Sequence, residues 1–205
     1  MFERPAYLLF LAHAASRSRV SDYLAALPPL QEYGGHYLAV APAASVERFG
    51  HNHNPQSLVL SRWPSLAIIQ EFWQSPAHQT LDWAGAQCVQ VAALEGEWNA
   101  CRDGQEIDEA LAIFLGPGPS PALLEAEGAR ALALVRQAQV TSLFGAWEQG
   151  DIAIYAWTSA QRARRQLVTF SSGQRGRSIL VPALAASRKP QCYQAREPLL
   201  LRAIA

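Results

Sequence analysis

Short apolar runs, each closed by turn-forming residues, recur through the first half of the chain. Residues 6–11, 36–41 and 57–63 are runs of this kind, bounded by proline, glycine or a polar stretch. Runs of about four to eight apolar residues between such boundaries are typical of buried strands. A fourth strand is predicted over residues 87–95. The residues between the second and third runs, 43–55, are predicted to form a polar loop.

Helices are predicted between these strands. Residues 20–30 carry leucine or valine every three or four positions, which indicates a helix with one apolar face. Gly34 is expected to end that helix, because glycine adopts the left-handed conformation without a steric penalty. Ser65 is expected to begin a second helix, and Ser75 a short third helix that runs to about Trp83.

The second half predicts the same order of elements, from about Leu111 to Ser187. Its hairpin turn is expected to be short, through Gln149 and Gly150, where the first half has its long polar loop. The predicted elements are a strand over 111–115, a helix from Ser120 that bears Leu123, Leu124, Leu132 and Val135, strands over 141–148 and 151–157, a helix from Thr158, and a strand over 178–184.

This order predicts an α+β fold of two ferredoxin-like βαββαβ units in tandem. A four-stranded sheet with helices on one face leaves its other face open, and two copies in one chain can cover each other. We therefore expect the sheets to pack face to face as an intramolecular pseudo-dimeric α+β barrel. Residues 1–98 form the first copy, 99–109 a linker, and 110–205 a diverged second copy with a basic C-terminal tail.

Three sequence motifs in the first copy suggest a family. They are the string YGGHYL over residues 33–38, the Trp-Pro-Ser of residues 63–65, and FWQSPAHQ over residues 72–79. Together they resemble the domain of unknown function 1330 family, over about residues 6–96. That family belongs to the dimeric α+β barrels, which include small monooxygenases and other enzymes acting on hydrophobic or aromatic compounds. The resemblance implies a barrel of two facing sheets, and it implies no particular reaction.

Composition and charge narrow the classes of partner. Half of the residues are hydrophobic, 17% are charged and the net charge is zero. No apolar run reaches about eighteen residues, so no membrane span is expected. Because the net charge is zero, nucleic-acid binding driven by overall charge is not expected either. From Ala160 onward nine Arg or Lys residues accompany one acid, Glu197. This imbalance indicates attraction between the halves or a solvated helix face; the alternative is a phosphate, nucleic-acid or anionic-surface site.

Cysteine and histidine usage argues against a metal. Three cysteines without CxxC spacing favour neither a disulfide framework nor a zinc site, and a cytoplasmic location is expected. The apolar run at residues 6–15 could be a secretory signal, but an acid and a proline precede it and the first strand needs it. His51 and His53 could share a metal, but no third ligand is identifiable. We expect no metal and no cofactor.

Polar residues on or beside the first-copy strands are the candidate site. The catalytic candidates are His36 and Arg62, since an imidazole can act as an acid or base near neutral pH. Strand alternation would place His36 on the face of Leu38 and Val40, which favours a histidine hydrogen-bonded at a strand edge. The candidate ligand-binding residues are Tyr7, His36, Tyr37, Ser61, Trp63 and Trp83.

Two functions of different classes remain open, and whether the chain is an enzyme is undecided. The first is a protein that binds or transforms a small hydrophobic or aromatic compound without a metal, at a site mainly in the first copy. The alternative is a non-catalytic small-ligand sensing or protein-interaction module. RNA recognition is disfavoured, because residues 7–10 and 57–60 lack the Lys-Gly or Arg-Gly pair that begins the RNA-binding strand motif of such domains. A monomer or weak homodimer is expected.

Overall fold

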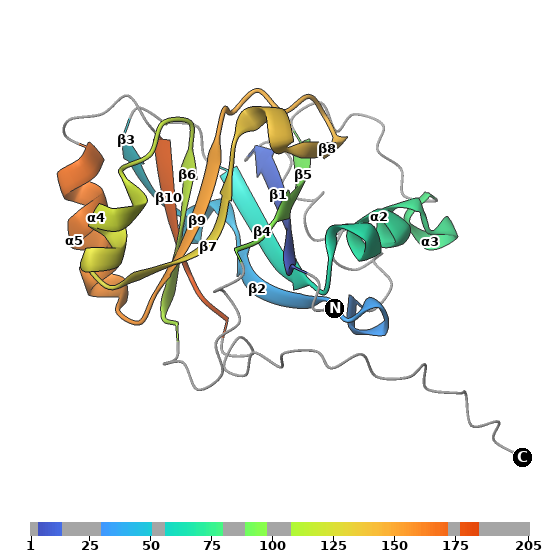
Figure 1. The fold of residues 1–205 in the computed structure, drawn as a ribbon, viewed down its shortest axis with the longest axis horizontal. Coiled ribbons are helices and arrows are strands. Elements are labelled where there is room, and N and C mark those ends of the chain that lie inside the picture. The colour runs from blue at the N-terminus through green and yellow to red at the C-terminus, as the bar shows by residue number, and fades with distance from the viewer. Residues whose placement is uncertain are drawn as a thin grey trace, which may run out of the picture.

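Two antiparallel five-stranded sheets make up most of the structure, a computed structural model (Figure 1). It describes residues 4–13, 30–50, 56–79, 89–97, 108–171 and 177–184. Helices lie on the outer faces of the sheets, so the predicted α+β class is confirmed. Among the described residues, no helix combines the length and apolar character needed to cross a membrane.

The first sheet has the strand order β2-β4-β1-β5-β8, with α2 and α3 on its outer side (Figure 1). A 3-10 turn, η2, precedes β2 and is followed by Gly34, whose φ of 74° is the left-handed conformation expected there. The elements are β1 (Ala6–His13), η2 (Leu30–Tyr33), β2 (His36–Ala41), β4 (Gln56–Trp63), α2 (Leu66–Gln74), α3 (Pro76–Gln79), β5 (Val89–Glu95) and β8 (Thr141–Phe144).

The second sheet has the strand order β3-β10-β6-β9-β7, with α4 and α5 on its outer side (Figure 1). Two short 3-10 turns, η3 and η5, precede β3 and β8. The elements are η3 (Ala43–Ser45), β3 (Glu47–Gly50), β6 (Ala110–Leu115), α4 (Pro121–Ala126), β7 (Ala129–Val135), η5 (Gln137–Gln139), β9 (Ile152–Trp157), α5 (Ala160–Ser171) and β10 (Arg177–Pro182).

Each sheet is completed by a strand from the other half of the chain. Strand β3 follows β2 in sequence but pairs with β10, and β8 follows β7 but pairs with β5. Two further backbone hydrogen bonds connect the halves. The N–H of Leu184 donates to the carbonyl of Leu38, and the N–H of Glu97 donates to the carbonyl of Leu132, both at 2.8 Å. The two halves are therefore joined along both sides of the molecule.

Equivalent positions in the segments from β2 to β4 and from β7 to β9 are separated by a constant number of residues. Positions 38 and 132, 47 and 141, and 63 and 157 each differ by 94. A β-bulge breaks the register at the same relative place in each half, between Tyr37 and Ala39 in β2 and between Ala131 and Ala133 in β7. The residues inside the bulges, Leu38 and Leu132, are those whose carbonyls accept the bonds from the other half.

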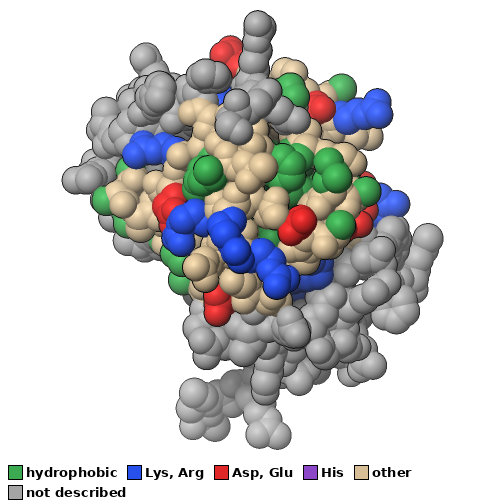
Figure 2. All heavy atoms as spheres, turned by 90° about the vertical axis from the view of Figure 1, so that its left-hand side faces the viewer, with side chains coloured by type: hydrophobic (Ala, Val, Ile, Leu, Met, Phe, Trp, Pro, Cys, Tyr) green, Lys and Arg blue, Asp and Glu red, His purple; other side chains and the backbone are tan. Residues whose placement is uncertain are grey.

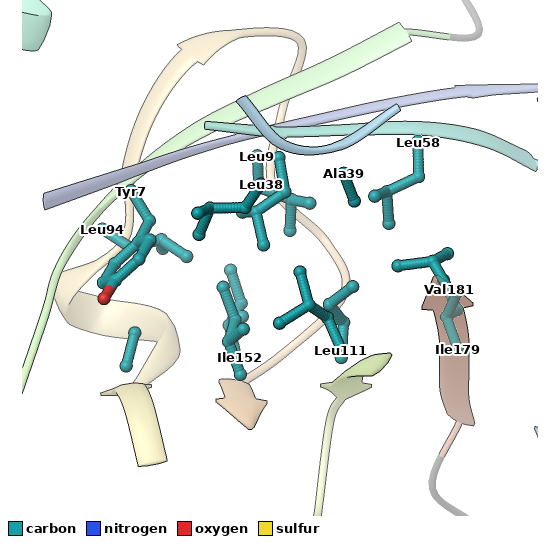
Figure 3. Packing of buried hydrophobic residues seen from close by; sticks show 14 of the residues in the cluster. Tyr7, Leu9, Leu38, Ala39, Leu58, Leu94, Leu111, Ile152, Ile179 and Val181 are labelled. Atoms are coloured by element: carbon teal, nitrogen blue, oxygen red, sulfur yellow. The ribbon is translucent and has the colours of Figure 1, made fainter. Parts of the chain in front are cut away.

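The largest apolar cluster fills the space between the inner faces of the sheets (Figure 3). Alternate residues of a strand point to opposite faces, so every strand except β3 and β8 contributes both to this cluster and to a second, outer cluster under the helices. Removing each large apolar side chain from water contributes about 1.5–3 kcal/mol. Inner residues labelled in Figure 3 include Leu9, Leu38 and Leu58 from the first sheet and Leu111, Ile152 and Ile179 from the second.

The helix predicted to carry Leu132 and Val135 is wrong. Helix α4 ends at Ala126, and Gly128, with a φ of 85°, turns the chain into strand β7. Leu132 and Val135 both lie in the inner cluster because the bulge in β7 shifts the alternation by one residue. The run of alanine and leucine in this segment fits a helix or a strand equally well, which explains the error.

The short hairpin predicted in the second half is also wrong. Strand β9 pairs with β7, while β8 leaves its neighbours and pairs with β5 of the other sheet. The loop predicted over 43–55 likewise contains the strand β3. Both connections therefore hold a 3-10 turn and an exchanged strand, and they span residues 42–55 and 136–151. The helix predicted over 20–30, the third helix beyond Gln79 and most of the linker lie outside the described residues.

Arginine side chains lie in a row across the outer face covered by α4 and α5 (Figure 2). Arg162, Arg164 and Arg165 of α5 are all exposed. The guanidinium of Arg164 donates from Nε to Oε2 of Glu47 at 2.6 Å, which joins α5 to the exchanged strand β3. This ion pair is of the kind expected for attraction between the halves. The basic residues after Leu184 lie outside the described residues.

Replacing Gly96 with alanine is expected to destabilise the fold. A Cβ atom there would lie 2.6 Å from Cε2 of Tyr7 and 2.7 Å from the carbonyl oxygen of Pro5. Overpacking of this kind costs about 1–3 kcal/mol. Gly118→Ala is the control, because its Cβ would meet Phe114 at an ordinary 3.6 Å. Urea unfolding of both variants measures the effect; equal stabilities would contradict the close packing at Gly96.

Candidate functional site

Three of the predicted site residues lie side by side on neighbouring strands. Strand β4 lies between β1 and β2, and the register places Arg62 opposite both Tyr7 and His36. Directly paired residues project from the same face of a sheet, with Cβ atoms about 4.5–5.5 Å apart. Leu94 of β5 pairs with Tyr7 and continues the row. We call His36, Arg62 and Tyr7 the polar row.

The polar row faces the space between the two sheets. Tyr7 and Leu94 belong to the inner cluster, and Tyr7 is only 1% exposed. Arg62 is half-buried and His36 is exposed. Figure 3 shows the Tyr7 ring pointing from β1 into the space between the sheets, beside Leu94 at one end of the cluster. The row thus runs from the apolar interior out to solvent.

The other predicted ligand-binding residues point away from the polar row. Tyr37 pairs with Ser61, and both lie on the outer face of the first sheet with Trp63. The indole Nε1–H of Trp63 donates to Oγ of Ser61 at 2.9 Å, and its ring centroid lies 4.7 Å from that of Phe72. Trp63 and Ser61 are therefore part of the packing beneath α2.

Other candidates from the sequence fall on segments that the structure leaves undescribed. They are Trp83, His51 and His53. Among the described residues, no group of three or more His, Cys, Asp or Glu side chains could hold a metal ion.

His36 does not share a face with both Leu38 and Val40, as alternation predicted. The bulge between Tyr37 and Ala39 turns Leu38 and Ala39 both toward the inner cluster, and Val40 packs on the outer one. His36 follows the register of Arg62 instead. The face predicted to be shared by His36, Leu38 and Val40 is therefore wrong for Val40, because a bulge leaves no mark in the pattern of apolar residues.

Electrostatics sets the protonation state of the row. Burial lowers the pKa of His36, and the positive charge of Arg62 lowers it further. At neutral pH the imidazole is therefore neutral, with one nitrogen that donates and one that accepts a hydrogen bond. The guanidinium keeps its charge. The row thus offers a cation, a neutral imidazole and a phenol beside an apolar interior.

Comparison with protein families finds a match in the first half of the chain. Residues 5–99 match the model for DUF1330, a domain of unknown function. The resemblance predicted over residues 6–96 is confirmed. A search of curated proteins found no match.

Solved structures resemble the chain along most of its length. An anthrone oxidase-like protein shares 12% identity at a TM-score of 0.46, covering 89% of this chain and 92% of its own. A protein of Fusobacterium nucleatum subsp. nucleatum ATCC 25586, provisionally assigned as a monooxygenase, shares 9% at 0.43, covering 90% and 94%. An aldoxime dehydratase shares 11% at 0.24, covering 89% and 82%. These values assign no chemistry to this chain.

The DUF1330 segment also contains a buried histidine that sequence reasoning did not place. His78 of α3 is 1% exposed, and its ring centroid lies 4.0 Å from that of Trp73 and 5.4 Å from that of Phe72. Burial lowers its pKa to about 4. Its neighbours are packing residues, and it lies on the outer side of the sheet, away from the polar row.

Acid is expected to destabilise the protein through His78. Between pH 6.5 and about 4 the unfolded chain binds a proton at this residue and the folded chain does not. The free energy of unfolding therefore decreases as the pH is lowered through that window. His78→Phe keeps a ring and removes the proton site, and should flatten the pH dependence by about 1–3 kcal/mol.

Urea unfolding at several pH values measures this slope. His36→Gln is the control, because His36 is exposed and its loss should leave most of the slope in place. Parallel pH curves for the wild type and His78→Phe would show that His78 is not the acid-sensitive group.

Proposed function

We propose that the chain is an intramolecular pseudo-dimer of two ferredoxin-like units, residues 1–98 and 110–205, forming one α+β barrel. The constant spacing of 94 residues, the matched bulges and the reciprocal exchange of β3 and β8 support this arrangement. Since both sheets already have their facing partner within the chain, a second copy is not needed to bury the inner faces. A monomer or weak homodimer follows.

The function that the site supports best is metal-free binding of a small hydrophobic or aromatic compound at the polar row. The observation that carries it is the register of Tyr7, Arg62 and His36 across three neighbouring strands. Binding sites for small molecules are commonly apolar surfaces with a few converging polar groups. Here the apolar surface is the rim of the inner cluster, and the strands hold the polar groups in a fixed geometry.

Arg62 and His36 are the residues to which we assign chemistry. A neutral imidazole beside a guanidinium can accept a proton from a bound compound while the cation stabilises the resulting negative charge. The phenol of Tyr7 lies on the other side of Arg62 and would contact the buried part of the ligand.

A non-catalytic sensing module is the second candidate. Side chains of both sheets fill the inner space, so a ligand would bind at the rim of the cluster and not at its centre. This filling favours the second candidate.

Binding at the row is expected to stabilise the folded protein. A ligand that binds only the folded state at about 100 times its dissociation constant adds about 2.7 kcal/mol of stability. A thermal-shift screen of flat aromatic and aliphatic compounds, with EDTA present, should therefore find compounds that raise the melting temperature. The same compounds should have a reduced effect on Arg62→Leu.

Arg48→Leu is the matched control, because Arg48 is an exposed arginine of β3 outside the row. It should respond as the wild type does. A wild-type protein that responds to no compound would overturn the binding function and favour the interaction module.

A further inference from the structure

We infer that the outer face of the second half, formed by α4 and α5, is an interface at which two copies of this chain associate. This face lies on the side of the second sheet that points away from the polar row (Figure 1). The inference therefore concerns a second surface and does not depend on ligand binding at the row.

Large apolar side chains are exposed on this side of the molecule. Among the described residues there are three, Leu123 of α4, Val168 of α5 and Leu134 of β7, with exposed fractions of 57%, 55% and 36%. Leu134 pairs with Ala153, which packs on the outer cluster, so Leu134 projects toward the same side as the two helices. Exposed apolar side chains that gather on one face commonly mark a site of protein association.

The two helices of this face carry opposite charges. Arg162 and Arg165 of α5 are exposed, and Glu125 and Glu127 at the end of α4 are exposed as well. Within the part of the chain that the structure describes, none of these four side chains forms an ion pair. Their charges can therefore act on a partner.

The helices lie next to each other, so these charges belong to one surface. A Cβ atom at Gly128, two residues after the end of α4, would lie 3.1 Å from Nη1 of Arg162. The guanidinium thus lies beside the end of α4. Figure 2 shows basic, acidic and apolar side chains together on this face.

A second copy of the chain matches this surface better than an anionic partner does. A lipid or nucleic-acid surface would attract the arginines of α5 but repel the glutamates of α4. A copy related by a two-fold axis between the helices places α4 of each chain against α5 of the other. Both charges are then paired, and the exposed apolar side chains are removed from water.

Sedimentation equilibrium of the full chain tests this interface. Over concentrations from about 1 to about 500 µM, the range for weak association, the average mass should rise from 22.4 kDa toward twice that value. The Debye length falls from about 10 Å at 0.1 M salt to about 3 Å at 1 M, so the dissociation constant should increase about tenfold between these salt concentrations.

Two double variants reverse the charge of one helix each. Arg162→Glu with Arg165→Glu makes α5 acidic, and Glu125→Lys with Glu127→Lys makes α4 basic. Each variant alone should dimerise at least about tenfold more weakly than the wild type, because α4 and α5 of two copies then carry the same sign. An equimolar mixture should associate as the wild type does, since one variant presents only acids and the other only bases.

Arg4→Glu with Arg48→Glu is the matched control. It changes the net charge as much as the α5 variant does, at two arginines outside this face: Arg4 pairs with Glu95 of β5, and Arg48 lies on β3 opposite Ile179 of the inner cluster. This variant should dimerise as the wild type does. Circular dichroism confirms that every variant is folded.

A protein that stays monomeric at every concentration would overturn the inference. Binding of that monomer to vesicles that contain phosphatidylserine would then assign the arginines to an anionic surface. Dimers that survive both charge reversals, or a mixture that fails to restore association, would place the contact on another face and would also overturn it.

Discussion

The exchange of β3 and β8 between the two sheets is the constraint on which the rest of the structure depends. Each exchanged strand covers an edge whose N–H and C=O groups would otherwise be open, and open edges promote pairing with other chains. The exchange also holds the inner faces together, so the large cluster between the sheets stays buried. Separation of the halves would expose both the edges and this apolar surface. The two halves are therefore expected to fold and unfold as one cooperative unit.

The same constraint positions the polar row. The bulge that lets Leu38 accept a bond from Leu184 lies two residues from His36, and it fixes how β2 lies on β4. On the other side of the row, Gly96 allows the chain after β5 to pass against the ring of Tyr7. The candidate site is thus built on regular strands whose ends are tied to the second half. A site of this kind is held in place by backbone pairing and needs no flexible loop to form it.

The sequence predicts the long strands well because their apolar runs are distinctive. The runs at 6–11, 57–63 and 111–115 are each within two residues of the observed strand ends. The four-residue strand β3 escaped prediction because it is short and partly exposed. A strand was predicted where β8 lies, but with the wrong partner, because its true partner β5 lies far away in sequence. Six ligand-binding candidates were named, and the five that the structure describes lie on opposite faces of one sheet. Only the observed register, including a bulge that no residue pattern reveals, separates Tyr7 and His36 from Tyr37, Ser61 and Trp63.

Strand exchange between the halves can be tested by cutting the chain between them. A protease site inserted after Asp103, between β5 and β6, would yield two fragments after cleavage. The exchange predicts that they elute together from a sizing column without denaturant and melt in one transition, because each still supplies a strand to the other's sheet. Fragments that separate into two folded monomers would contradict it.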